Sequence, residues 1–93
     1  MKLLMIIVDS ECKEELEVLL SRRKVGYTEI PGAHGVGTSG VRMGSRAFPK
    51  TSSLFFSVLA DDSVSDLRDE ITSYCEACER RMKMFVWTAE EIV

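Results

Sequence analysis

The glycine-rich stretch in the middle of the chain has the residue types that bind anions. Glycine has no side chain, so backbone N–H groups can approach an anion closely, and clustered N–H groups attract it. The stretch from Ile30 to Ala60 has no Asp or Glu, although the whole chain has a net charge of -3. We therefore predict an anion-binding or partner-binding loop over residues 32–50, with glycines Gly32, Gly35, Gly37, Gly40 and Gly44 and cations Arg42, Arg46 and Lys50.

Arg42 and Arg46 lie four residues apart in this loop, where two guanidinium groups can clamp one phosphate or carboxylate. The pattern is not a Walker motif, because Gly-Lys-Ser/Thr is absent. It is not a Rossmann fingerprint either, because it leads from one strand into another. The alternative is a flexible hairpin whose glycines only permit turns. A functional loop is favoured, since long loops without regular structure tend to be functional.

The two cysteines of Cys75-x-x-Cys78 form a second candidate site, either a redox pair or half of a metal site. Both extend the apolar stripe of a predicted helix, where a cysteine is more often a small core hydrophobe. The neighbouring Arg80 and Arg81 keep the redox interpretation open, because cations stabilise a thiolate.

His34 is the only histidine. Copies of it in an oligomer could share a metal ion, but a loop histidine without a special partner is the simpler interpretation. The sequence gives no second histidine, and no serine or carboxylate that can be paired with His34. We therefore predict that the protein is not an enzyme.

Length and composition describe one small folded domain spanning residues 1–93, with 45% hydrophobic and 29% charged residues. The negative net charge argues against binding to nucleic acid or to a membrane surface. The apolar run Leu3–Val8 is too short for a signal-peptide core or a membrane span. An odd number of cysteines favours a reducing compartment over a secreted disulfide framework. We expect a cytoplasmic protein with reduced thiols.

Hydrophobic spacing predicts a β-α-β-β-α-β order. The first helix begins at Ser10, a plausible N-cap, and runs to about Lys24 with an apolar stripe of Cys12, Leu16, Leu19 and Leu20. The second follows Asp61-Asp62-Ser63 and has a stripe of Val64, Leu67, Ile71, Tyr74, Cys75 and Cys78. Strands are predicted at Leu3–Val8, Val25–Ile30 (closed by Pro31-Gly32), Leu54–Leu59 and Met82–Ala89. With right-handed crossovers, this order gives a ferredoxin-like α+β sandwich: a four-stranded antiparallel sheet with two helices on one face.

The predicted strands are apolar on both faces, whereas two helices can cover only one. In the first strand Leu3, Met5 and Ile7 alternate with side chains that are equally apolar. The uncovered face would be larger than the apolar patch that a monomer usually exposes. We therefore predict a closed homo-oligomer with the sheets facing inward, most simply a homotrimer.

The order of elements and the position of the glycine-rich loop resemble the P-II family of trimeric signalling proteins and their P-II-like relatives. Thr28-Glu29-Ile30-Pro31-Gly32 resembles the Thr-Glu-Val-x-Gly end of that family's second strand. Lys83-Met84-Phe85-Val86 resembles the Gly-Lys-Ile-Phe-Val start of its last strand. Residues 32–50 take the place of the T-loop, which contacts target proteins.

The resemblance implies a sensor that binds a small effector, such as an adenine nucleotide, in the clefts between subunits. Gly35 and Gly37 would then supply backbone donors, and Arg80, Arg81 and Lys83 the positive charge. The loop would regulate a target such as a transporter or an enzyme. The family's glycine-rich B-loop is replaced here by residues 75–81.

Two alternatives start from the same topology. A P-II-like metal-tolerance protein of the CutA type would use His34, Cys75 and Cys78 as a metal- or redox-responsive site. An RNA-recognition module would need exposed aromatic residues and a basic surface, and the acidic charge and the missing Gly-Phe motif argue against it.

Overall fold

A computed structural model describes residues 1–38, 40–74 and 82–93 of the chain. The elements follow in the order β1 (Lys2–Asp9), α1 (Lys13–Arg22), β2 (Thr28–Ala33), β3 (Gly35–Gly37), β4 (Gly40–Arg42), β5 (Ser52–Leu59), α2 (Val64–Tyr74) and β6 (Met82–Thr88). A short 3-10 helix precedes each α-helix: η1 (Ser10–Cys12) and η2 (Asp61–Ser63).

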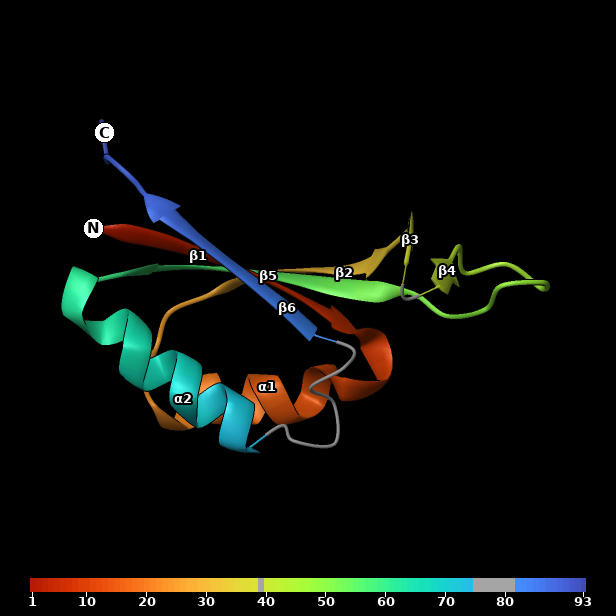
Figure 1. The fold of residues 1–93 in the computed structure, drawn as a ribbon, viewed down its shortest axis with the longest axis horizontal. Coiled ribbons are helices and arrows are strands. Elements are labelled where there is room, and N and C mark those ends of the chain that lie inside the picture. The colour runs from red at the N-terminus through yellow and green to blue at the C-terminus, as the bar shows by residue number, and fades with distance from the viewer. Residues whose placement is uncertain (39, 75–81) are drawn as a thin grey trace.

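The main sheet of the described chain has four antiparallel strands in the order β2-β5-β1-β6. Both α-helices lie on the same face of this sheet (Figure 1). This is the ferredoxin-like α+β sandwich that the sequence predicts, and the prediction is confirmed. The helix crossovers place β1 and β5 in the centre and leave β2 and β6 as edge strands.

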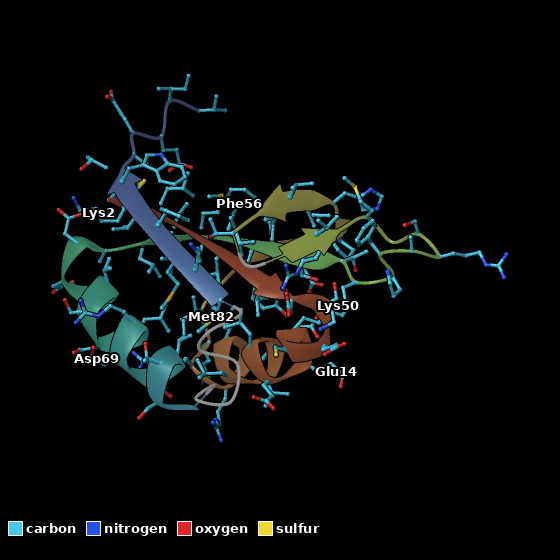
Figure 2. The ribbon with its side chains drawn as sticks, turned by 45° about the vertical axis from the view of Figure 1, so that its right-hand side comes forward. Lys2, Glu14, Lys50, Phe56, Asp69 and Met82 are labelled. Carbon is cyan, nitrogen blue, oxygen red and sulfur yellow. The ribbon has the colours of Figure 1, made fainter. Side chains whose placement is uncertain are left out.

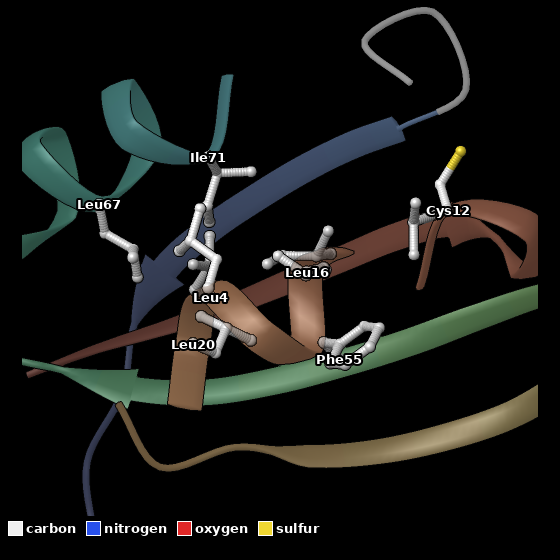
Figure 3. Close-up of a cluster of buried hydrophobic side chains, with 10 residues drawn as sticks. Leu4, Cys12, Leu16, Leu20, Phe55, Leu67 and Ile71 are labelled. Carbon is white, nitrogen blue, oxygen red and sulfur yellow. The ribbon is translucent and has the colours of Figure 1, made fainter. Parts of the chain in front are cut away.

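The core lies between the helices and one face of the sheet (Figure 3). Strand side chains alternate between the two faces, so Leu4, Ile6 and Val8 all point from β1 toward the helices. The predicted stripe of the first helix is entirely buried: Cys12, Leu16, Leu19 and Leu20. Phe55 of β5 is also buried, as are Leu67 and Ile71 of the second predicted stripe. Met82 and Met84 of β6 pack partly buried against this cluster.

Strand β2 begins and ends later than the sequence predicts. It starts at Thr28 and continues through Pro31 and Gly32 to Ala33. Proline cannot donate a ladder hydrogen bond, but β2 is an edge strand, where the missing donor is tolerated. The pairing with β5 shifts between Ile30 and Ala33, and Gly32 there has a φ of +68°. The Pro31-Gly32 pair therefore makes an irregularity within the strand rather than ending it.

The first helix also begins differently from the prediction. Ser10 is not an N-cap, because it lies inside η1, and the cap residue Asp9 makes no side-chain capping hydrogen bond there. The Ser10 hydroxyl is instead 2.7 Å from the Thr51 hydroxyl, and the Ser10 N–H donates to the Thr51 carbonyl over 3.1 Å. These contacts tie the end of β1 to the residues that lead into β5.

The glycine-rich stretch contains regular structure that the sequence did not reveal. Strands β3 and β4 form a short antiparallel ribbon, with Gly35 opposite Arg42 and Gly37 opposite Gly40. Gly40 has a φ of +127°, which an L side chain rarely adopts, so glycine is required at this turn. The long loop is therefore a structured ribbon followed by the turn of residues 43–51.

The sheet face opposite the helices is as apolar as the sequence predicts. Cross-strand register builds it in rows, with Leu3 beside Val58 and Trp87, and Met5 beside Phe56 and Phe85. Figure 2 shows Phe56 on the side of the sheet away from Glu14 of helix α1. Within the single chain Val58 is 58%, Phe85 47% and Trp87 44% exposed. We call this the outer sheet face.

No helix in residues 1–38, 40–74 or 82–93 is long and apolar enough to cross a membrane.

Helix α1 and strand β2 bring two carboxyl groups together at the surface. Glu29 raises the pKa of Glu17, first through a hydrogen bond between the two side chains, with burial and charge repulsion adding to it. Lys13 lies 3.6 Å from Glu29 and partly offsets the repulsion. A hydrogen bond between two carboxyl groups requires a proton on one of them, so the contact is favourable only while Glu17 is protonated.

Substituting Glu17→Gln should therefore raise stability at pH 7–8. A carboxyl group whose pKa is raised by folding stabilises the protein at low pH and loses that contribution as the pH rises through its folded pKa. The gain should be at most about 1 kcal/mol, because solvent screens partly exposed charges. Urea unfolding from pH 3 to 8 at fixed protein concentration measures it, with Glu15→Gln on the same helix as control. A gain that does not grow with pH would contradict the assignment.

Candidate functional site

A cavity of about 290 Å3 lies where the end of β1 meets the β3–β4 ribbon. Three of the predicted effector residues, Gly35, Gly37 and Lys83, line it together with Asp9 and Arg42. We call it the ribbon cavity. The predicted residues come from two elements that are far apart in the sequence, β3 and β6, and the fold brings them to one place.

Strand pairing explains why these residues meet. Lys83 of β6 pairs with Ile7 near the end of β1, so its side chain lies on the outer sheet face beside Ile7. Asp9 is the last residue of β1 and pairs with Ser52 at the start of β5. The chain segment that joins β2 to β5 carries the ribbon across this end of the sheet (Figure 1).

The most buried charged contact of the cavity joins Asp9 to Arg42. Arg42 Nε donates to Asp9 Oδ1 over 2.5 Å, and the two side chains are only 13% and 4% exposed. The hydrogen bond to Asp9 raises the pKa of Arg42, against the opposing effect of burial. Arg42 therefore stays charged, and the ribbon is anchored to the central strand by an ion pair shielded from water.

Sequence reasoning missed Asp9 as a site residue. It treated Asp9 only as the end of the first strand and assigned Arg42 to a clamp with Arg46. The signal in the sequence is only the type of residue, a carboxylate at the end of an apolar strand. Nothing in the local pattern indicates that Asp9 and Arg42 are partners, because their sequence separation is 33 residues.

The other loop cations lie outside the ribbon cavity. Arg46 and Lys50 are exposed in the turn after β4, and Lys50 lines a separate depression beside Ser10. Backbone hydrogen bonds close this turn, from Met43 to Phe48 and from Gly44 to Lys50. The structure therefore brings Arg42 alone of the three loop cations into the cavity.

His34 is exposed between β2 and β3 and packs beside Gly44, where an added Cβ would meet its Nε2 at 3.2 Å. Within the described part of the chain, no three His, Cys, Asp or Glu side chains gather closely enough to hold a metal ion. Four predicted residues, Cys75, Cys78, Arg80 and Arg81, lie outside the described residues.

The buried Cys12 does not follow the sequence prediction of reduced thiols. Its sulfur is disulfide-bonded, so the prediction is wrong for this residue. A disulfide depends on whether folding brings two Cα atoms within about 7 Å, which the number and spacing of cysteines do not determine.

Among solved structures, several of one P-II-like protein, in different ligand states, match this fold over nearly its full length. CPII, a nitrogen regulatory PII-like protein from Thiomonas intermedia K12 bound to ADP, AMP and bicarbonate, is 26% identical with a TM-score of 0.73. The match covers 92% of this chain and 82% of that chain. This chain has the fold of a P-II-like protein.

CPII bound to ADP and bicarbonate gives the same identity, TM-score and coverage. The apo form of CPII is 24% identical with a TM-score of 0.67, over 92% of this chain and 85% of that chain. No protein-family model and no curated protein matches the sequence. CPII is a nitrogen regulatory PII-like protein, and P-II-like signalling proteins are regulators without enzymatic activity. The similarity to CPII therefore supports the predicted class of a regulatory protein.

The disulfide of Cys12 can be tested directly by counting free thiols. Iodoacetamide added to the unfolded, unreduced protein should label one of the three cysteines, because a disulfide occupies two. Reduction before labelling should give three labels by mass spectrometry. Cys12→Ser is the matched variant and should give two labels without reductant. Three labels on the unreduced wild type would contradict the bond.

Proposed function

We propose that this P-II-like protein binds an adenine nucleotide in the ribbon cavity and regulates a protein partner through residues 32–50. The observation that carries the proposal is the meeting of Gly35, Gly37 and Lys83 with Arg42 around one cavity. CPII, the similar protein, has been solved with ADP, AMP and bicarbonate bound, which supports the choice of ligand.

The ribbon cavity offers the groups that a nucleotide phosphate needs. Arg42 and Lys83 bring two cations to its wall, against one carboxylate from Asp9. Arginine can make two parallel hydrogen bonds to a phosphate, whereas lysine acts as a point charge. Gly35 and Gly37 expose backbone at the same wall, where N–H groups can approach an anion without a side chain in the way. Ile7 and Val36 provide the apolar surface against which a base can pack.

A second copy of the chain would complete the site. Pockets that bury a small ligand usually enclose about 300–1,000 Å3, and the ribbon cavity is at the lower limit. Lys83 and Ile7 belong to the outer sheet face, whose large side chains are half-exposed in one chain. At about 25 cal/mol per Å2, burying this face would contribute substantially to an assembly. We propose a homotrimer whose sheets face inward, with the nucleotide held at the contacts between subunits.

The exposed turn of residues 43–51 is the proposed partner-binding surface. It presents Met43 and Phe48, which are 39% and 48% exposed, beside Arg46 and Lys50. Apolar side chains next to cations suit an acidic protein surface with an apolar centre. From the family resemblance, we propose that the partner is a transporter or an enzyme whose activity this protein regulates. Residues 1–93 are proposed to act as a single domain.

Calorimetry with ADP, AMP and adenosine should show heat for the nucleotides. The substitution Lys83→Ala should weaken ADP binding about ten-fold or more, because the variant lacks a charged contact to the phosphate. It should change adenosine binding much less. Lys2→Ala, a cation at the opposite end of the β1–β6 pair, is the matched control and should bind like the wild type. The paired substitution Arg80→Ala plus Arg81→Ala tests the predicted residues outside the described part of the chain.

Two results would contradict nucleotide binding. One is the absence of heat with every adenine compound, with and without bicarbonate. The other is heat with Zn2+ or Cu2+ alone that His34→Ala or Cys78→Ser abolishes, which would favour the metal-responsive alternative.

Sedimentation equilibrium should give a mass near three times the 10.5 kDa of the chain. Substituting Val58→Glu on the outer sheet face should shift the mass to one chain, because three carboxylates would face each other in the assembly. Val18→Glu is the matched control, since Val18 is a similarly exposed valine on helix α1. It should leave the mass unchanged. A monomeric wild type, or a trimeric Val58→Glu variant, would contradict the inward-facing assembly.

A further inference from the structure

We propose that Asp9 is a positioning residue of the ribbon cavity: it holds Arg42 in place, so that the cavity selects nucleotides with phosphate over the uncharged nucleoside. The inference rests on the proposed nucleotide binding and adds a specificity-determining pair to it. Asp9 does not itself bind the ligand in this arrangement. Its role is to keep the long, flexible arginine side chain ordered before a ligand arrives.

Burial and backbone pairing hold Asp9 in one position. Its residue is 3% exposed, and its backbone is held in the β1–β5 ladder opposite Ser52. The following residue, Ser10, is tied to Thr51 through both its backbone and its hydroxyl. A carboxylate removed from water in this way requires a close positive partner, because an uncompensated buried charge is strongly unfavourable. The contact with Arg42 Nε over 2.5 Å supplies that partner.

The ribbon leaves room for the guanidinium of Arg42. Arg42 Nη1 would lie 3.4 Å from a Cβ atom added to Gly40, so this end of the guanidinium lies beside the first residue of β4. Gly40 itself lines the cavity, as does Gly37, which lies opposite it on the ribbon. The guanidinium therefore extends from Asp9 at the sheet to the ribbon at the cavity wall, and its direction is set at both ends.

This ordering affects anions more than uncharged ligands. An arginine side chain that is free in solvent loses rotamer freedom when it binds phosphate, and that cost weakens binding. An arginine already fixed by a buried carboxylate has lost that freedom on folding. The carboxylate also brings a negative charge near the ligand, which would oppose binding directly. Positioning of Arg42 strengthens phosphate binding, whereas repulsion by Asp9 weakens it, so substitutions can separate the two effects.

The experiment measures ADP and adenosine affinity by calorimetry in Asp9→Asn, Arg42→Gln and the double variant, beside the wild type. Asp9→Asn keeps the size of the side chain and removes its charge. We expect Asp9→Asn and Arg42→Gln each to weaken ADP binding about ten-fold, with adenosine affinity unchanged. Because Asp9 acts through Arg42, the double variant should bind ADP as Arg42→Gln does. Asp61→Asn, an exposed carboxylate with an ion pair far from the cavity, is the matched control.

Each contrary outcome has a distinct meaning. If the wild type binds no nucleotide, the proposed function and this inference both fail. If the wild type binds ADP and Asp9→Asn binds it equally or more tightly, the function stands and the positioning role is wrong. Equal losses of ADP and adenosine would show a general structural defect and would also overturn it. If Asp9→Asn does not fold, the comparison of Arg42→Gln with the double variant decides, because tighter ADP binding by the double variant would show direct repulsion by Asp9.

Discussion

The structure depends on the pairing of β1 with both β5 and β6 in the centre of the sheet. This pairing fixes which side chains of β1 point to the helices and which point away, since a shift of one residue would exchange the two faces. One set, with Leu4 and Ile6, forms the core with the helices. The other, with Leu3 and Met5, forms the outer sheet face. Because both sets are apolar, β1 contributes to the core of the domain on one face and to the proposed interface between subunits on the other.

The same pairing decides where the candidate site lies. β1 ends at Asp9, and at that end of the sheet it meets Lys83 through the β6 register and Ser52 through the β5 register. The ribbon of β3 and β4 is anchored there by the Asp9–Arg42 ion pair. The glycine-rich ribbon is thus attached to a central strand of the sheet. In the proposed function, this attachment is the route by which a ligand in the ribbon cavity would act on the exposed turn of residues 43–51.

The comparison with CPII agrees with this arrangement at the level of the fold and the regulatory class. At 26% identity most side chains differ, so the particular residues of the site rest on the geometry of this chain. Asp9 and Arg42 are the clearest example, because their contact and their burial are observed in this chain. The disulfide of the buried Cys12 is a second feature that rests on the structure of this chain.

The sequence by itself determined the elements whose signal is local. Helical spacing found the buried stripe of Leu16, Leu19 and Leu20, and two apolar strand faces indicated a sheet with a surface left over. It also picked out Gly35, Gly37 and Lys83, through their resemblance to a family pattern. The sequence did not predict that β2 continues through Pro31. Proline is tolerated within an edge strand, and the local pattern does not show that β2 lies at an edge.

Only the tertiary structure decided the contacts between distant residues. Ser10 has the chemistry of a helix cap, yet its hydroxyl meets Thr51 because the fold places the start of β5 beside it. Arg42 and Arg46 look equivalent in the sequence, but a buried carboxylate attracts only the one within reach. Ion pairs, disulfides and strand edges depend on distances in space, and the local pattern of residues does not contain those distances.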